Sequence, residues 1–194
     1  SNPKVGLLAL STDLTIEKDF NSICYKLPLD IFVNRIHNEN PLTKENLLKM
    51  YEKIESITEK ILPGEKINTV AYACTSGTIA IGDDKIKKKI QQAKPGCQVT
   101  TPITSAIKAF NKMNIKKVAV FTPYPDSVNK TISEYLNEKN IEIISFGTFN
   151  LDLDVDFARI DPKYLLEILT KLNINDANAL FVSCTALPAL EILD

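Results

Sequence analysis

Short apolar runs alternate with longer amphipathic stretches along this chain. Several of the runs, including residues 118–121, are apolar at every position instead of at alternate ones. Strands with this pattern are usually buried on both faces, as in parallel sheets. The pattern predicts six strands, at residues 4–10, 29–34, 69–73, 117–121, 141–146 and 179–183.

The amphipathic stretches between these runs predict helices. The longest begins at Thr43, a residue suited to cap a helix, and ends before Pro63 and Gly64. The last opens with Asp161 as a cap and Pro162 at the first helical position. Strands that alternate with helices imply right-handed crossovers, and so an α/β fold with mainly parallel sheets flanked by helices. The predicted helices cover residues 43–62, 78–93, 103–113, 126–138 and 161–172.

A weak internal repeat divides the chain into two halves. The sequence VAYACTS at residues 70–76 resembles LFVSCTA at residues 180–186, since each is an apolar strand followed by Cys-Thr and a small residue. A Pro-Gly break at residues 95–96 lies between the two copies and is typical of a junction. We therefore expect two pseudo-symmetric lobes, residues 1–98 with Cys74 and residues 99–194 with Cys184.

Composition and charge exclude several classes of protein. Of the 194 residues, 44% are hydrophobic and 24% charged, as in folded globular domains. Lys and Arg total 23 against 24 Asp and Glu, so the basic excess typical of nucleic-acid-binding proteins is absent. The longest uncharged stretch near the C-terminus, residues 177–190, is shorter than the roughly 20 apolar residues that span a membrane. We expect neither a nucleic-acid partner nor a membrane anchor.

The four cysteines stand at positions 24, 74, 97 and 184, and the single histidine is His37. They form no C-x-x-C pair, so a zinc site is not expected. Their spacing also differs from that of a secreted disulfide framework. We therefore expect free thiols, a cytoplasmic location without a signal peptide, no metal and no cofactor.

Cys74 and Cys184 each directly follow the apolar core of a predicted strand. Ligands of open parallel sheets bind beyond the carboxyl ends of the strands. Helix N-termini at that edge favour anions and lower the pKa of a thiol, so we expect both cysteines to lie at helix starts with lowered pKa values. Thr75, Ser76 and Gly77 then offer hydroxyl and backbone N–H groups to a substrate carboxylate.

Two thiols on opposite sides of a substrate suit one kind of reaction. A thiolate removes a proton from the carbon next to a carboxylate, and the opposing thiol returns one from the other face, which inverts the stereocentre. The same pair suits an alkene isomerisation or a decarboxylation with one sulfur as nucleophile. Tyr124 follows another strand, and we weigh a hydroxyl that reaches an anion equally against a loop-packing role. Cys24 and Cys97 are interpreted as packing residues.

Two other functions stay open. A cysteine hydrolase needs a histidine at the thiol, and His37 lies after a different strand with no evident partner to orient it. A non-catalytic protein that binds small carboxylates needs no thiol of low pKa. Alkylation of the thiols with and without candidate acids separates such a binding protein from an enzyme.

The motifs together resemble those of the aspartate/glutamate racemase superfamily. Within it, the chain is most similar to the branch of maleate cis-trans isomerases, arylmalonate decarboxylases and ectoine-utilisation proteins. The resemblance rests on AYACTSGT at residues 71–78 and SCTAL at 183–187, and extends to STDLTIE at 11–17, VTTP at 99–102, TPY at 122–124 and ARI at 158–160.

This resemblance implies two similar α/β lobes with the active site in the cleft between them, and no cofactor. It matches Cys74 with the nucleophile or base of the first lobe and Cys184 with the opposing acid or base of the second. Tyr124 and the backbone at Thr75 and Ser76 match the groups that hold the substrate carboxylate. Gly77 and Thr185 lie in the same motifs and are further substrate-binding candidates.

Two candidate substrate-binding residues depart from the maleate isomerases, which have asparagine where this chain has Asp13 and Asp154. Asp13 instead fits the T-D-x-T-x-E pattern of the ectoine-utilisation proteins. Two carboxylates beside the thiols repel a dicarboxylate and favour a substrate that carries a cation, unless Asp13 only caps the helix that starts near Thr15. Family members also continue for several tens of residues and return to the first lobe, so we expect that return to be missing here.

The expected function is a cofactor-independent two-cysteine racemase or isomerase that acts next to the carboxylate of a small acid, such as an amino-acid derivative in ectoine-type catabolism. The alternatives are a maleate cis-trans isomerase, an arylmalonate-type decarboxylase and a small-carboxylate binding protein. The expected partner is the small carboxylic-acid substrate, and assembly into a homo-oligomer stays open.

Overall fold

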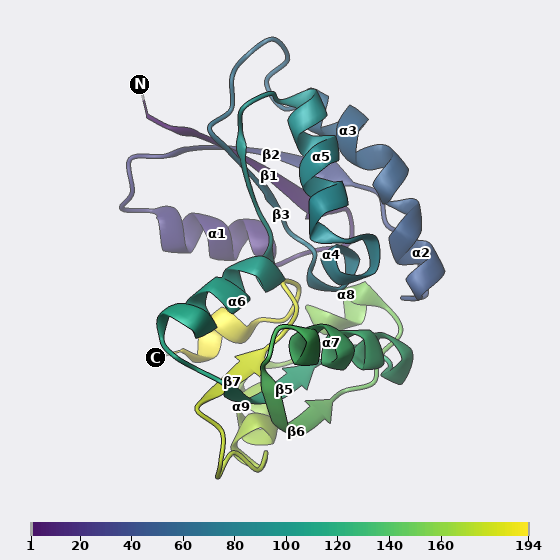
Figure 1. Ribbon diagram of the computed structural model, residues 1–194, viewed down its shortest axis with the longest axis vertical. Coiled ribbons are helices and arrows are strands. Elements are labelled where there is room, and N and C mark those ends of the chain that lie inside the picture. Colours follow the sequence, from purple (N-terminus) through teal and green to yellow (C-terminus); the bar gives the residue numbers. More distant parts are fainter. Residues whose placement is uncertain (1, 194) are drawn as a thin grey trace.

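Two parallel sheets form the framework of the computed structural model, which describes residues 2–193 (Figure 1). The first sheet has the strand order β2-β1-β3-β4 and the second the order β6-β5-β7. Every strand pair within them is parallel. The strands are β1 (Lys4–Leu10), β2 (Asp30–Ile36), β3 (Thr69–Tyr72), β4 (Gln98–Thr100), β5 (Lys117–Thr122), β6 (Glu142–Thr148) and β7 (Ala179–Val182).

Helices cover both faces of the first sheet, with α1 on one face and α3 and α5 on the other (Figure 1). The helix α6 carries the chain from β4 to the second sheet, and α4 of the first half packs against α7 of the second. The helices are α1 (Ile16–Cys24), α2 (Lys44–Lys49), α3 (Tyr51–Glu59), α4 (Thr75–Ile81), α5 (Asp83–Ala93), α6 (Pro102–Lys112), α7 (Asp126–Glu138), α8 (Asp154–Phe157), α9 (Pro162–Thr170) and the 3₁₀ helix η1 (Ala189–Ile192).

The predicted α/β fold of two parallel sheets flanked by helices is confirmed. The all-apolar segment at residues 118–121 is buried, and Val118 and Val120 of β5 have no exposed surface, whereas β7 is only partly buried. One apolar core is continuous between the halves, since it includes Leu8 of β1 and Tyr72 of β3 together with these valines.

Several elements differ from the predictions, among them the short helices α8 and η1, which were not predicted. The helix predicted at residues 78–93 is two helices, because Gly82 has a φ of 98° that interrupts the helical backbone. The helix predicted at residues 43–62 is divided into α2 and α3 at Met50. The three-residue strand β4 was not predicted, and it spans the proposed boundary at residues 98 and 99 while pairing with β3 of the first sheet. The division into two lobes at that point stays a prediction.

Within the described residues, no helix has both the length and the apolar character needed to cross a membrane.

Candidate active site

A small cavity lies at the carboxyl ends of strands from both sheets. Eight of the nine predicted site residues line it, and the ninth, Gly77, lies behind the thiol of Cys74. The cavity volume is about 10 Å³, which is room for a single water molecule. The structure therefore describes a closed form of the site. The lining residues are Leu10, Thr12, Asp13, Cys74, Thr75, Ser76, Tyr124, Asp154, Cys184, Thr185 and Ala186.

Cys74 caps the N-terminus of α4. Its sulfur accepts a hydrogen bond from the backbone N–H of Gly77 at 3.2 Å and lies 3.8 Å from the hydroxyl of Ser76. A Cβ at position 77 would lie 2.9 Å from the Cys74 sulfur, from Met50 and from Tyr72, so only glycine fits this close approach. Because Thr75 and Ser76 begin the helix, their backbone N–H groups have no acceptor within it.

Cys184 follows β7 with a backbone φ of 132°, a conformation that residues other than glycine rarely adopt. Such strain costs about 1–3 kcal/mol and persists only where neighbouring contacts hold the backbone. The prediction that this thiol lies at a helix start is wrong, because a turn follows and η1 begins only at Ala189. The Cys184 sulfur instead accepts a hydrogen bond from the backbone N–H of Ala186 at 3.4 Å.

The prediction of lowered thiol pKa values is also wrong. Burial raises the pKa of Cys74 to about 12, the Gly77 N–H opposes the rise, and the nearby Asp154 and Asp13 add to it. Burial also raises the pKa of Cys184 well above that of an ordinary thiol, although its contacts with Tyr124 and the Ala186 N–H oppose the rise. Desolvation outweighs the hydrogen bonds at both positions, so the resting site holds two neutral thiols.

Tyr124 lines the same cavity as the two thiols and is only 2% exposed. Burial raises the pKa of its hydroxyl well above the usual value, and the charges of Cys184 and Cys74 add to this effect. The hydroxyl therefore stays protonated and available as a donor. The ring packs edge-on against Phe157 at a centroid distance of 5.8 Å, and the backbone carbonyl accepts a hydrogen bond from Asn129 at 2.7 Å.

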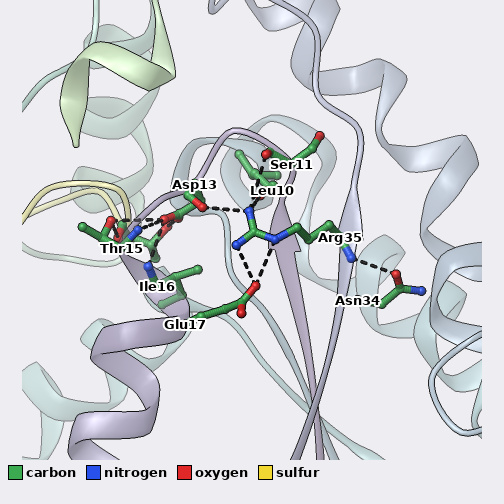
Figure 2. Close-up of polar contacts among 9 residues, drawn as sticks. Leu10, Ser11, Asp13, Thr15, Ile16, Glu17, Asn34 and Arg35 are labelled. Atoms are coloured by element: carbon green, nitrogen blue, oxygen red, sulfur yellow. Dashed lines mark hydrogen bonds and ion pairs between the residues drawn. The ribbon is translucent and has the colours of Figure 1, made fainter. Parts of the chain in front are cut away.

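Asp13 both caps α1 and contacts the second half of the chain. One carboxylate oxygen accepts hydrogen bonds from the backbone N–H groups of Thr15 and Ile16, each at 2.9 Å (Figure 2). The other oxygen accepts from the hydroxyl of Thr185 at 2.8 Å. Asp13 thus binds the first backbone N–H groups at the start of α1, where Thr15 is the N-cap residue, and it also lines the cavity.

Asp154 begins α8 and faces the first half of the chain. Its carboxylate accepts hydrogen bonds from the Asn38 amide at 2.5 Å and the Thr12 hydroxyl at 3.3 Å. Burial raises the pKa of this carboxyl to about 6; the Thr12 and Asn38 hydrogen bonds oppose the rise, and the charge of Asp13 adds to it.

Thr12 and Asn38 are site residues that the sequence analysis missed. Thr12 stands beside Asp13 in the STDLTIE segment, which offered a signal, whereas Asn38 only follows the second strand. The expected alternative of a cysteine hydrolase fails, because His37 is exposed and lies outside the residues that line the cavity. Cys24 and Cys97 also lie outside this lining.

The chain is similar to several known proteins of one kind. The family model for arylmalonate decarboxylase (Amdase) matches residues 44–194. A maleate isomerase from Geobacillus stearothermophilus is 23% identical over 98% of this chain and 81% of its own length. A maleate isomerase from Alcaligenes faecalis is 24% identical over 68% of this chain and 55% of its own length.

Solved structures show the same fold. One is a mutant of Nocardia farcinica maleate cis-trans isomerase with a covalently bound succinylcysteine intermediate; it has a TM-score of 0.89 and 15% identity, and the match covers 99% of this chain and 82% of that one. A Pseudomonas putida maleate isomerase with maleate has a TM-score of 0.85 and 18% identity, over 98% of this chain and 81% of that one. These matches confirm the predicted branch of the superfamily and the predicted enzyme class, an isomerase. Because the family model covers more than half of its residues, the chain belongs to the arylmalonate decarboxylase family.

Proposed function

We propose that this protein is a cofactor-independent isomerase that uses Cys74 and Cys184 on either side of a carbon atom next to a substrate carboxylate. One observation carries the proposal: both thiols, from motifs about 110 residues apart, line the same cavity together with Tyr124. A paired acid and base around one carbon atom is the arrangement that proton transfer at that carbon needs.

The carboxylate of the substrate has donors available on the Cys74 side. The backbone N–H groups of Thr75 and Ser76 are free of helix partners, and the protonated Tyr124 hydroxyl offers a further hydrogen bond. Donors aimed at a carboxylate also stabilise the negative charge that develops there when the neighbouring carbon loses its proton.

In this proposal a thiol loses its proton only after the substrate has bound. With a pKa of about 12, Cys74 is protonated near neutral pH in the closed cavity. A thiolate formed there, held by the Gly77 N–H, is a stronger base than an ordinary thiolate and is better matched to a weakly acidic C–H group.

A substrate of the maleate type uses the same two groups differently. The Cys74 thiolate forms a bond to one alkene carbon while the Cys184 thiol gives its proton to the other, which leaves a single bond free to rotate. Reversal of both transfers after rotation releases the trans isomer and restores both thiols to their starting states. The similarity to maleate isomerases and to a succinylcysteine intermediate in one of them favours this version.

The charge of the cavity favours a different substrate class. Asp13 and Asp154 line it, and its lining residues within the described chain include no Lys, Arg or His. Two charges of like sign at about 4 Å repel by about 4 kcal/mol even at an effective dielectric constant of about 20. An amino acid or N-substituted diamino acid, as in ectoine-type catabolism, carries a cation that offsets this repulsion. A dicarboxylate such as maleate needs a proton on Asp154 instead.

The test is NMR in D₂O of candidate acids incubated with the protein. The panel contains maleate, an arylmalonate, both enantiomers of several amino acids and an N-acetylated diamino acid. Isomerisation, decarboxylation or deuterium uptake at the carbon next to the carboxylate in one class supports the proposal and identifies the substrate class. If an acid protects the thiols from iodoacetamide but none is converted, the protein is a carboxylate binder and the proposal is wrong.

A further inference from the structure

Arg35, in β2, forms hydrogen bonds with the backbone of the loop between β1 and α1 (Figure 2). One guanidinium nitrogen, Nη1, donates to the backbone carbonyls of Leu10 at 3.0 Å, Ser11 at 3.4 Å and Asp13 at 2.8 Å. The other two nitrogens donate to one carboxylate oxygen of Glu17, at 2.9 and 2.6 Å. A single side chain thus connects three carbonyls of the loop with the first turn of α1.

The loop that Arg35 holds makes the contacts to the segment after β7. The Thr185 hydroxyl donates to Asp13 at 2.8 Å and lies 3.2 Å from the backbone carbonyl oxygen of Ala73. The Thr15 hydroxyl donates to the backbone carbonyl of Thr185 at 2.9 Å. Thr185 is therefore bound through both its side chain and its backbone to residues around the first sheet.

Cys184 is the residue that needs such support. Its φ of 132° is unfavourable for a residue with a side chain, and the contacts of the adjacent Thr185 fix the backbone next to it. Its sulfur accepts a hydrogen bond from the N–H of Ala186, two residues away along the same turn, and contacts the hydroxyl of Tyr124 in the second half of the chain. The hydrogen bonds that join Thr185, next to this strained residue, to the first half of the chain come from Ala73 and from the loop that Arg35 binds.

We propose that Arg35 and Glu17 are positioning residues for Cys184, acting through the β1–α1 loop and the Asp13–Thr185 contact. The inference rests on the proposed function for the catalytic role of Cys184. The position of Cys184 in the fold does not depend on that proposal. Their side chains are each 38% exposed, and an exposed ion pair of this kind contributes little to stability by itself. The planar, branched guanidinium is instead suited to bind several acceptors in fixed directions, which a lysine ammonium cannot reproduce.

The test compares the rates at which iodoacetamide alkylates Cys184 and Cys74, each measured by mass spectrometry of its own peptide. Cys74 is an internal reference, since the described hydrogen-bond partners of its sulfur are Gly77 and Ser76 of α4. In Arg35→Gln and Glu17→Gln we expect the ratio of the Cys184 rate to the Cys74 rate to change by about fivefold or more. Arg35→Lys should change the ratio in the same direction, because the fork of donors is lost while the charge is kept.

The matched control is Lys89→Gln. Lys89 forms a partly exposed ion pair with Glu55 at 3.0 Å between α5 and α3, away from the loop. We expect it to leave the ratio within about twofold of the wild type. Thr185→Val keeps the Arg35 contacts and removes only the hydroxyl, so it should reproduce the change even if the Arg35 variants fold poorly.

An unchanged ratio in the Arg35, Glu17 and Thr185 variants overturns the inference, as does an equal rise at both cysteines, which indicates general loosening. A changed ratio supports the positioning role even when no acid in the panel is converted. Failure of the proposed function is thus distinguishable from failure of this inference.

Discussion

Asp13 and Thr185 are joined by a hydrogen bond of 2.8 Å although 172 residues separate them in the sequence. Asp13 follows the first strand of one sheet, and Thr185 follows the last strand of the other, beside Cys184. The same loop reaches Asp154 through Thr12. These contacts close a cavity too small for any organic acid, so a substrate can enter only if some of them open.

Replacement of Asp13 tests whether its carboxylate does more than cap a helix. Asp13→Ala removes both the cap of α1 and the contact to Thr185, and should lower the free energy of unfolding by about 2–4 kcal/mol. The control is Asp161→Ala, since Asp161 caps α9 through the N–H groups of Lys163 and Tyr164 and is only a cap. It should cost about 1 kcal/mol in urea unfolding. Equal losses in the two variants would show that the Thr185 contact adds no stability.

Replacement of Asp154 should change how stability depends on pH. Because the pKa of this carboxyl rises from 3.8 to about 6 on folding, the folded protein binds its proton more tightly than the unfolded chain does. Ionisation therefore destabilises the fold, and stability is lost as pH rises from about 4 to about 6. Asp154→Asn should raise the free energy of unfolding at about pH 7, relative to its effect at about pH 4, by about 2 kcal/mol. Urea unfolding at the two pH values measures this, and an identical effect at both would contradict the raised pKa.

The Tyr124 hydroxyl should matter for turnover and little for folding. Tyr124→Phe keeps the ring contact with Phe157 and removes one donor to the substrate carboxylate. We expect kcat/KM for the acid identified by NMR to fall about tenfold or more. Tyr164→Phe, on the exposed face of α9, is the control and should leave kcat/KM unchanged. A Tyr124→Phe protein as active as the wild type would remove Tyr124 from the proposed site.

The charge of the cavity should decide between substrate classes. Asp154→Asn removes one of its two carboxylates while preserving an oxygen that can accept from Asn38. If repulsion disfavours dicarboxylates, this substitution should raise kcat/KM for maleate relative to that for an amino acid by about tenfold or more. Strong maleate turnover by the wild type, unaffected by the substitution, would refute the charge effect.

The sequence predicted the sheets well because short apolar runs without alternation, between longer amphipathic stretches, are typical of strands in parallel sheets. The strand at residues 4–10 and the helix at residues 126–138 have the predicted limits. The strand β4 escaped prediction because three residues carry no periodicity. Gly82 could have indicated the break before α5, since a glycine inside a helical pattern often marks an end.

The sequence predicted which residues form the site, but not how deeply they are buried or how burial changes their pKa values. The repeat of a strand followed by Cys-Thr pointed to Cys74 and Cys184, which do line one cavity. Their raised pKa values depend on how closely the two halves pack, which no local pattern records. The same holds for Asn38, whose amide reaches Asp154 only in the folded chain.

Deuterium uptake by the two enantiomers of a chiral substrate tests the two-thiol mechanism most directly. The wild type should incorporate deuterium at the carbon next to the carboxylate and invert it. Cys74→Ser and Cys184→Ser should each lose inversion, and each should retain slow exchange of one enantiomer only, a different one in each variant, because one base remains on one face. NMR in D₂O measures both exchange and inversion. Inversion at the wild-type rate in either variant would contradict a mechanism that needs both cysteines.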